Sequence, residues 1–311
     1  MIVNLFAKPF FRGDIVVDHY DLREGDDMTV PRMKKIKAGD IRLQTAEWAG
    51  KGGPVFCIHG LTSNSRTWDS IAAALSGKYR IIAMDLRGRG MSDKPGAGYS
   101  VDIHARDLDA LLDVMKIKKT VIMGHSLGAV IGLYYAAKHP ERVKKLILID
   151  GAGKLTKKQT EMVLKGIMPS LERLGKVFPS FEDYVRPLKQ APFLRPWTST
   201  QEDFYRYEMK RVKDGIISRV RLDTIHEELM NLVQGDVCEL YPGVECPVLV
   251  LRASMGMLRK DDVLLPKGAL KKMIRGLNCM WLVEIPGANH YSIMFDRNRI
   301  RDRSIINFLE S

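Results

Sequence analysis

The segment Gly124-His-Ser-Leu-Gly128 constrains the fold of this chain more than any other stretch of the sequence. It follows an apolar run typical of a buried strand and precedes an apolar helical pattern, so the backbone must turn from strand to helix within a few residues. Such a turn strains the backbone of its middle residue and leaves room only for small residues on either side. We therefore expect Ser126 to stand exposed at the edge of a sheet, at a helix N-terminus whose partial positive charge stabilises a developing anion.

Apolar runs of strand length alternate with helical patterns along most of the chain. The runs that predict buried strands are residues 55–58, 80–84, 120–123, 145–149, 248–251 and 280–285. Apolar residues spaced three and four apart predict helices over residues 68–75, 101–115, 127–138 and 266–274. This alternation predicts an α/β fold with a mostly parallel, doubly wound sheet that helices cover on both faces.

Residues 154–240 interrupt the alternation. They contain no convincing buried strand, and prolines separate helical patches at residues 159–174, 181–189, 202–213 and 220–232. We predict a helical cap over residues 154–240, inserted between two strands of a core made of residues 1–153 and 241–311. Residues 1–30 form either an extra strand pair or a segment that wraps the core, and their sequence pattern does not favour one of these over the other.

Composition indicates an ordinary globular chain. Apolar residues make up 45% and charged residues 28%, and no stretch approaches the roughly 20 apolar residues that a membrane span needs. The N-terminus lacks the pattern of a signal peptide, so we expect a cytoplasmic protein with no membrane partner. The four cysteines form no CxxC pair and have no histidine partners at metal spacing, which indicates neither a disulfide framework nor a metal site.

The formal net charge of +12 raises the question of an acidic partner. Lysines and arginines, however, come in small groups that are spread over the chain and interspersed with acids. This distribution favours a solvated basic surface over a nucleic-acid site, while steering of an anionic substrate remains open.

A nucleophilic serine needs a base to take its proton, and His290 has the most suitable position. It lies in a turn directly after the last apolar run, where a loop residue can lean over the edge of the sheet toward Ser126.

The other histidines suit different roles. His125 is adjacent to Ser126, but we expect its side chain to point away along the turn. His59 ends a strand, and we expect it to fix the following loop by hydrogen bonds. His104 and His139 have the pattern of ordinary surface or helix-end residues.

Four motifs, in this order, resemble the α/β-hydrolase superfamily over about residues 35–309. They are His59-Gly-Leu61, Asp85-Leu-Arg-Gly-Arg-Gly-Met-Ser-Asp93, Gly124-His-Ser-Leu-Gly128 and Gly287-Ala-Asn-His290. The resemblance, which is to the serine branch with a helical cap, implies that Ser126 is the nucleophile and His290 the general base. It also implies that the backbone N–H groups of Leu61 and Leu127 bind the oxyanion, and that residues 85–93 shape a loop.

The acid of the triad is the point where this sequence departs from the commoner pattern. Members of the superfamily often carry it a few residues after the strand that here spans residues 247–252, and no acid stands at that offset. Asp150 ends the strand before the cap, a position that some branches use instead. The role requires a carboxylate that orients the imidazole. Because of its position at the end of that strand, we favour Asp150 over Asp262, with Asp261 third.

These features predict a serine hydrolase that cleaves carboxylic esters of small molecules through an acyl-enzyme, with no cofactor. Lactone or carbon–carbon bond hydrolysis is the nearest alternative, and a low-turnover small-molecule receptor with the same residues is another class that remains open. The sequence indicates no oligomeric state. Large apolar residues of the cap indicate an apolar acyl or alcohol group in the substrate, or only packing of the cap's own helices. These residues are Met162, Met168, Phe178, Phe193, Trp197, Phe204, Tyr205 and Met209.

Overall fold

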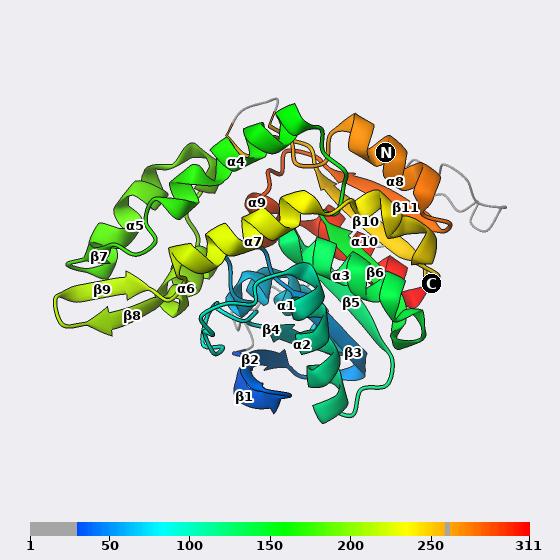
Figure 1. Ribbon diagram of the computed structural model, residues 1–311, viewed down its shortest axis with the longest axis horizontal. Helices are drawn as coiled ribbons and strands as arrows, with labels where there is room; N and C mark the ends of the chain where they lie inside the picture. The colour runs from blue at the N-terminus through cyan, green and yellow to red at the C-terminus, as the bar shows by residue number, and fades with distance from the viewer. Residues whose placement is uncertain (1–29, 259–261) are drawn as a thin grey trace.

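An eight-stranded sheet forms the centre of the computed structural model, which describes residues 30–258 and 262–311 (Figure 1). Its strands are β1 (Arg32–Ala38), β2 (Ile41–Trp48), β3 (Gly50–Ile58), β4 (Gly77–Met84), β5 (Thr120–His125), β6 (Val143–Ile149), β10 (Val248–Ala253) and β11 (Met280–Ile285). They lie in the order β1-β2-β4-β3-β5-β6-β10-β11, and only the pairs β1–β2 and β2–β4 are antiparallel. The predicted α/β fold with a mostly parallel sheet is therefore confirmed.

Helices cover both faces of this sheet. Helices α2 (Val101–Val114), α3 (Leu127–Lys138) and α8 (Lys267–Gly276) pack on one face, and α1 (Asp69–Leu75), α9 (Ser292–Phe295) and α10 (Arg299–Glu310) pack on the other. Successive residues of a strand point to opposite faces, so Phe56 and Ile58 of β3 join the first core and Val55 and Cys57 join the second. The sequence of each central strand is therefore a continuous run of apolar residues.

The first two strands were not predicted from the sequence. Strand β1 is an edge strand rich in exposed lysines, a composition that discourages pairing with other chains but hides the strand in a polar stretch. Strand β2 buries Leu43 in one core and Ala46 and Trp48 in the other, so it shows no simple alternation. The sequence left open whether residues 1–30 form an extra strand pair or wrap the core. Residues 1–29 lie outside the described residues.

The stretch between β6 and β10 carries the predicted helices and, in addition, a small sheet. The helices are α4 (Lys157–Leu171), α5 (Phe181–Gln190), α6 (Ser199–Glu208) and α7 (Leu222–Gln234), and the strands are β7 (Val177–Phe178), β8 (Met209–Val212) and β9 (Gly215–Ser218). The helix predicted over residues 202–213 is wrong beyond Glu208, where β8 begins. The two-residue turn Lys213-Asp214 pairs Val212 with Gly215, whose φ of 142° only glycine adopts readily, and this hairpin ends the helical pattern.

We call residues 154–240 the inserted segment; their status as a separate domain remains a prediction. In Figure 1 the inserted segment forms a layer over the core, with α4 and α7 crossing above the sheet. Its own apolar cluster includes Tyr184, Leu194, Phe204 and Tyr205, and it also takes in Phe295 of α9. No helix in the described part of the chain is both long and apolar enough to cross a membrane.

Candidate active site

Ser126 occupies the strained turn that the sequence predicts between β5 and α3. Its backbone has φ 56° and ψ −117°, a region that non-glycine residues rarely adopt. A Cβ on Gly124 would lie 2.1 Å from the carbonyl oxygen of Gly128, and a Cβ on Gly128 would lie 2.0 Å from that of Ile58. Both glycines are therefore required by the close approach of backbone segments that places Ser126 at the start of α3.

His290 and Asp150 are brought together from loops that follow two different strands. The Nδ1–H of His290 donates to Oδ2 of Asp150 at 2.8 Å, and the amide of Ala253 donates to Oδ1 at 3.1 Å. Asp150 is only 1% exposed, so its carboxylate is held by both donors in a water-poor setting. Since a carboxylate only accepts, this contact places the proton of neutral His290 on Nδ1 and leaves Nε2 as the basic atom.

The two other candidate acids have different surroundings. The Asp262 carboxylate accepts the amide of Leu258 at 2.9 Å, within the loop that follows β10. Oδ2 of Asp262 also lies near Gly166 of α4, where an added Cβ would be 3.7 Å away. Asp261 lies outside the described residues.

His59 fixes the loop that follows β3, as the sequence predicts. Its Nδ1–H donates to the carbonyl of Gly60 at 2.7 Å, and its Nε2 accepts the amide of Leu86 at 3.0 Å. This pattern needs a neutral ring, and burial lowers the pKa of His59 to about 4. In a trans peptide the N–H points opposite to the preceding carbonyl, so holding the Gly60 carbonyl also orients the N–H of Leu61.

The two residues predicted to supply the oxyanion donors border the same space. Leu61 and Leu127 line one cavity together with Ser126 and His290. Leu127 is the first residue of α3, and the first N–H groups of a helix have no acceptor within the helix. Its amide can therefore serve a ligand oxygen beside Ser126.

Two sequence expectations about histidines are wrong. His125 does not point away along the turn: its Nε2–H donates to the backbone carbonyl of His290 at 3.1 Å, and the two rings lie 4.5 Å apart. Burial, with His290 nearby, holds the pKa of His125 well below its ordinary value. His104 lies in the first turn of α2 but is fully buried instead of at the surface, and its Nε2 contacts Glu228 of the inserted segment at 2.6 Å. His139 follows the last residue of α3, as expected for a helix-end residue.

Residues 85–93 shape a loop, as the resemblance implies. The Asp85 carboxylate accepts the amides of Ser65 and Met91 and the hydroxyl of Tyr207 at 2.6 to 2.8 Å. Tyr207 belongs to α6, so this loop also anchors the inserted segment.

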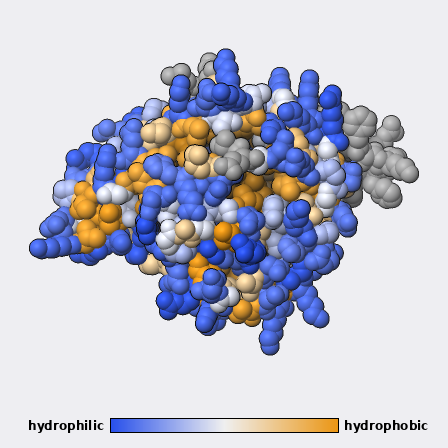
Figure 2. Space-filling view, viewed as in Figure 1, coloured by the Kyte–Doolittle hydropathy of each residue, from blue (hydrophilic) through white to orange (hydrophobic). Residues whose placement is uncertain are grey.

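Two cavities meet at Ser126 and His290. The larger has a volume of about 220 Å³ and is walled mainly by aliphatic side chains of α4 and α7. They include Val163, Leu164, Ile167, Leu229 and Leu232. In the space-filling view, apolar side chains reach the surface over this part of the inserted segment (Figure 2).

The smaller cavity, of about 70 Å³, has a mixed lining of hydroxyl and aromatic groups, with Thr62, Thr67 and Ser170 among them. Of the large apolar residues singled out in the sequence, Phe204 and Tyr205 line this cavity, and none lines the larger one. The aliphatic wall was missed because its residues follow an ordinary amphipathic pattern.

Within residues 30–258 and 262–311, no group of three or more His, Cys, Asp or Glu side chains is arranged to hold a metal ion.

The chain belongs to the α/β-hydrolase fold family, whose pattern matches residues 53–296. It is 27% identical over 303 residues to 2-(acetamidomethylene)succinate hydrolase of Mesorhizobium japonicum, covering 96% of this chain and 99% of that protein. A crystal structure of E-2-(acetamidomethylene)succinate hydrolase superposes with a TM-score of 0.79 at 25% identity, covering 90% of this chain and 100% of the other.

A 3-hydroxybutyrate-oligomer hydrolase of Cupriavidus necator is 27% identical over 277 residues, covering 85% of this chain and 92% of that protein. The chain also matches mycobacterial proteins of uncharacterized function at 43% identity, but over only 105 residues, which is 31% of their length. Two relatives that are similar along most of the chain, those of Mesorhizobium japonicum and Cupriavidus necator, are hydrolases by name, and this chain shares the α/β-hydrolase fold.

Proposed function

We propose that this protein is a serine hydrolase that cleaves carboxylic esters of small molecules through an acyl-enzyme. The observation that carries the proposal is the hydrogen bond from His290 Nδ1 to the buried Asp150, combined with a strained Ser126 that borders the same two cavities as His290. Ser126 is the nucleophile, His290 the general base and Asp150 the acid that orients the imidazole.

The reaction begins when His290 Nε2 takes the proton of Ser126 as its oxygen attacks the ester carbonyl. The tetrahedral oxyanion forms beside the amides of Leu61 and Leu127, at the N-terminus of α3. The imidazolium, stabilised by Asp150, then protonates the leaving alcohol. Water activated by His290 attacks the acyl-enzyme and releases the acid.

The aliphatic lining of the larger cavity supports an apolar group in the substrate. A chain of methylene groups placed against the α4 and α7 side chains would bury apolar surface worth roughly 0.8 kcal/mol per CH₂. The name of the Cupriavidus necator relative describes a 3-hydroxybutyrate oligomer, whose units are joined by ester bonds, and this favours ester cleavage. Lactone or carbon–carbon bond hydrolysis and a low-turnover receptor are the alternatives.

The test is steady-state hydrolysis of p-nitrophenyl esters of increasing acyl length by the native protein and by Ser126→Ala. We expect turnover that rises with chain length until the larger cavity is filled, and a loss of at least about 1,000-fold in kcat for the variant. The matched control is Ser304→Ala on α10, which lines neither cavity and should keep native rates. Native rates in Ser126→Ala would refute the mechanism. A native protein that turns over none of the esters would refute ester cleavage and leave lactone or carbon–carbon bond hydrolysis and the receptor role as candidates.

A further inference from the structure

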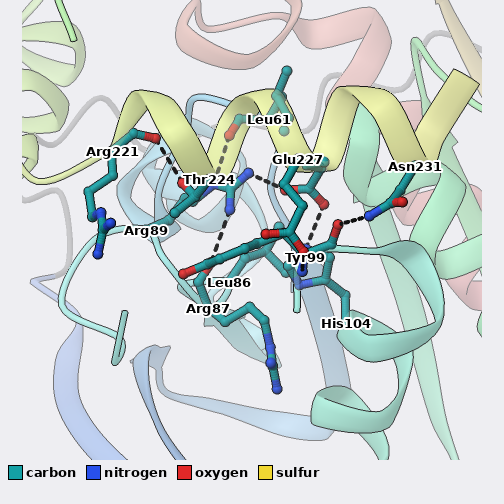
Figure 3. A network of polar contacts seen from close by, with 12 residues as sticks. Leu61, Leu86, Arg87, Arg89, Tyr99, His104, Arg221, Thr224, Glu227 and Asn231 are labelled. Carbon is teal, nitrogen blue, oxygen red and sulfur yellow. Dashed lines mark hydrogen bonds and ion pairs between the residues drawn. The ribbon is translucent and has the colours of Figure 1, made fainter. Parts of the chain in front are cut away.

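A buried arginine connects the inserted segment to the loop that carries the Leu61 amide. Arg89 is 0% exposed, and its Nε–H donates to the carbonyl of Leu61 at 3.0 Å. Its Nη1–H donates to the carbonyl of Arg87 at 3.1 Å, and its Nη2 forms an ion pair with Glu228 of α7. Figure 3 shows the Arg89 side chain reaching between Leu61 and this helix. The guanidinium is therefore held on three sides.

Glu228 is itself fixed from both sides. One carboxylate oxygen faces Arg89 and the other contacts His104 Nε2 at 2.6 Å, and Glu228 is only 1% exposed. Burial alone would raise the pKa of Glu228, but His104 and Arg89 outweigh it and lower the pKa to about 2. A buried charge pair is costly to break, so the position of α7 fixes the position of the Arg89 head group.

The two carbonyls that flank the Leu61 amide are thus both held. His59 holds the Gly60 carbonyl, which belongs to the same peptide group as the Leu61 N–H, and Arg89 holds the Leu61 carbonyl on the other side of that residue. Both peptide planes next to Leu61 have a fixed rotation, and a donor that is fixed in advance stabilises a developing oxyanion best. Loss of the Arg89 contact would leave only one of the two planes held.

We propose that Arg89 and Glu228 are positioning residues for the oxyanion loop, so that the seating of α7 against the core orients the Leu61 amide. This inference rests on the proposed function, because it assigns the Leu61 N–H to the oxyanion.

The same helix offers a matched control beside Glu228. Glu227 accepts the amides of Gly98 and Tyr99 at 2.9 and 3.0 Å, and Asn231 donates to the carbonyl of Tyr99 at 2.8 Å (Figure 3). These contacts anchor α7 to the core at a loop that does not include Leu61. Glutamine at this position keeps an oxygen that can accept both amides, so Glu227→Gln removes one carboxylate charge from α7 while the helix keeps its place and the Arg89 contact to Leu61 is retained.

The experiment compares Arg89→Lys, Glu228→Gln and Glu227→Gln with the native protein. Lysine keeps a charge opposite Glu228 but lacks the Nε–H of the guanidinium fork, so the contact to Leu61 is lost. For each variant, kcat and KM on a p-nitrophenyl ester are measured, together with the inhibition constant of an alkyl trifluoromethyl ketone, which forms a tetrahedral adduct with the serine, and the melting temperature.

We expect kcat of Arg89→Lys to fall about 10- to 100-fold and the inhibition constant to rise by a similar factor, with KM within twofold of native. Glu228→Gln should show the same pattern where it folds, and Glu227→Gln should stay within twofold in all three quantities. A purely structural role would change the melting temperature without this selective loss of the tetrahedral state.

Arg89→Lys decides the matter even where Glu228→Gln does not fold. A folded Arg89→Lys with native kcat and native inhibition, or one that matches Glu227→Gln, overturns the positioning role and leaves the proposed function standing. Native rates in Ser126→Ala overturn the proposed function instead. Where esters are not turned over, the inhibition constants alone test the inference, and a native protein that does not bind the ketone overturns it.

Discussion

The Asp150 carboxylate has two donors and a fixed direction, which makes the choice of triad acid testable at a single residue. One of its oxygens serves the Ala253 amide and the other serves His290. An asparagine at this position would keep its oxygen on the Ala253 amide and turn its NH₂ group toward His290. The imidazole would then carry its proton on Nε2 and could not accept the proton of Ser126.

We therefore expect Asp150→Asn to lower kcat by about 1,000- to 10,000-fold with little change in folding. The comparison is Asp262→Asn, which removes a carboxylate that accepts the Leu258 amide and should leave kcat within about threefold of native. Steady-state kinetics on the best p-nitrophenyl ester, with circular dichroism to check folding, provide the measurement. A larger loss in Asp262→Asn than in Asp150→Asn would transfer the role to Asp262.

At the scale of elements, α4 and α7 decide what the larger cavity accepts. Leu164 of α4 lines the cavity, whereas Met168, four residues further along the same helix, is 46% exposed. A tryptophan in place of Leu164 would occupy part of a cavity of about 220 Å³, and a tryptophan in place of Met168 would project into solvent.

We expect Leu164→Trp to shift the preferred acyl chain to a shorter length and to lower kcat/KM for longer chains by about tenfold, since each excluded methylene forfeits about 0.8 kcal/mol. Acetyl ester hydrolysis should change less than threefold. Met168→Trp is the control and should keep the native profile. An unchanged chain-length profile in Leu164→Trp would show that acyl chains bind elsewhere.

The sequence predicts some of these elements better than others, for physical reasons. Strands such as β5 and β6 are buried on both faces, so each appears as an apolar run that stands out from its neighbours. Strands β1 and β8 lie at the edges of their sheets and carry exposed basic residues, so no apolar run marks them.

The candidate site shows the same contrast between local and distant information. Ser126 is recognisable because its turn restricts the residues immediately beside it. Arg89 and Glu228 are 139 residues apart, and no local pattern could pair them. The contact of His125 with the loop of His290 was missed for the same reason: it joins residues 165 positions apart.

At the scale of the whole molecule, the net charge of +12 does not make either of the two cavities in the described part of the chain basic. The charged groups that line the cavities are paired: Lys154 with Asp236 at 3.0 Å, and Arg173 with Glu208 at 3.0 Å. Burial alone would lower the pKa of Arg173, but the nearby Glu208 carboxylate outweighs burial and raises this pKa above its ordinary value. The cavities consequently present paired charges and neutral side chains to a substrate.

The stability of the whole molecule should depend on pH because it buries neutral histidines. The pKa of His59 is about 4 in the folded protein, against an ordinary value of 6.5. Between these values the unfolded chain binds a proton at His59 that the folded protein does not bind. The contribution of His59 to the free energy of unfolding is therefore complete above pH 6.5 and is lost as the pH falls toward 4. His125 acts in the same direction, whereas buried carboxyls with a raised pKa, such as Asp69 and Asp302, act in the opposite one.

A comparison of the native protein with His59→Asn isolates the contribution of this histidine. Each pKa unit corresponds to about 1.4 kcal/mol, so the native free energy of unfolding should fall by about 3 kcal/mol more than that of the variant between pH 7 and pH 4. Asparagine does not titrate and can still donate to the Gly60 carbonyl, which keeps the loop after β3 close to its native form. Urea unfolding at half-unit pH steps measures the difference. Parallel pH dependence of the two proteins would mean that His59 is already protonated near pH 6.5 in the fold, and its neutral bridge between Gly60 and Leu86 would be wrong.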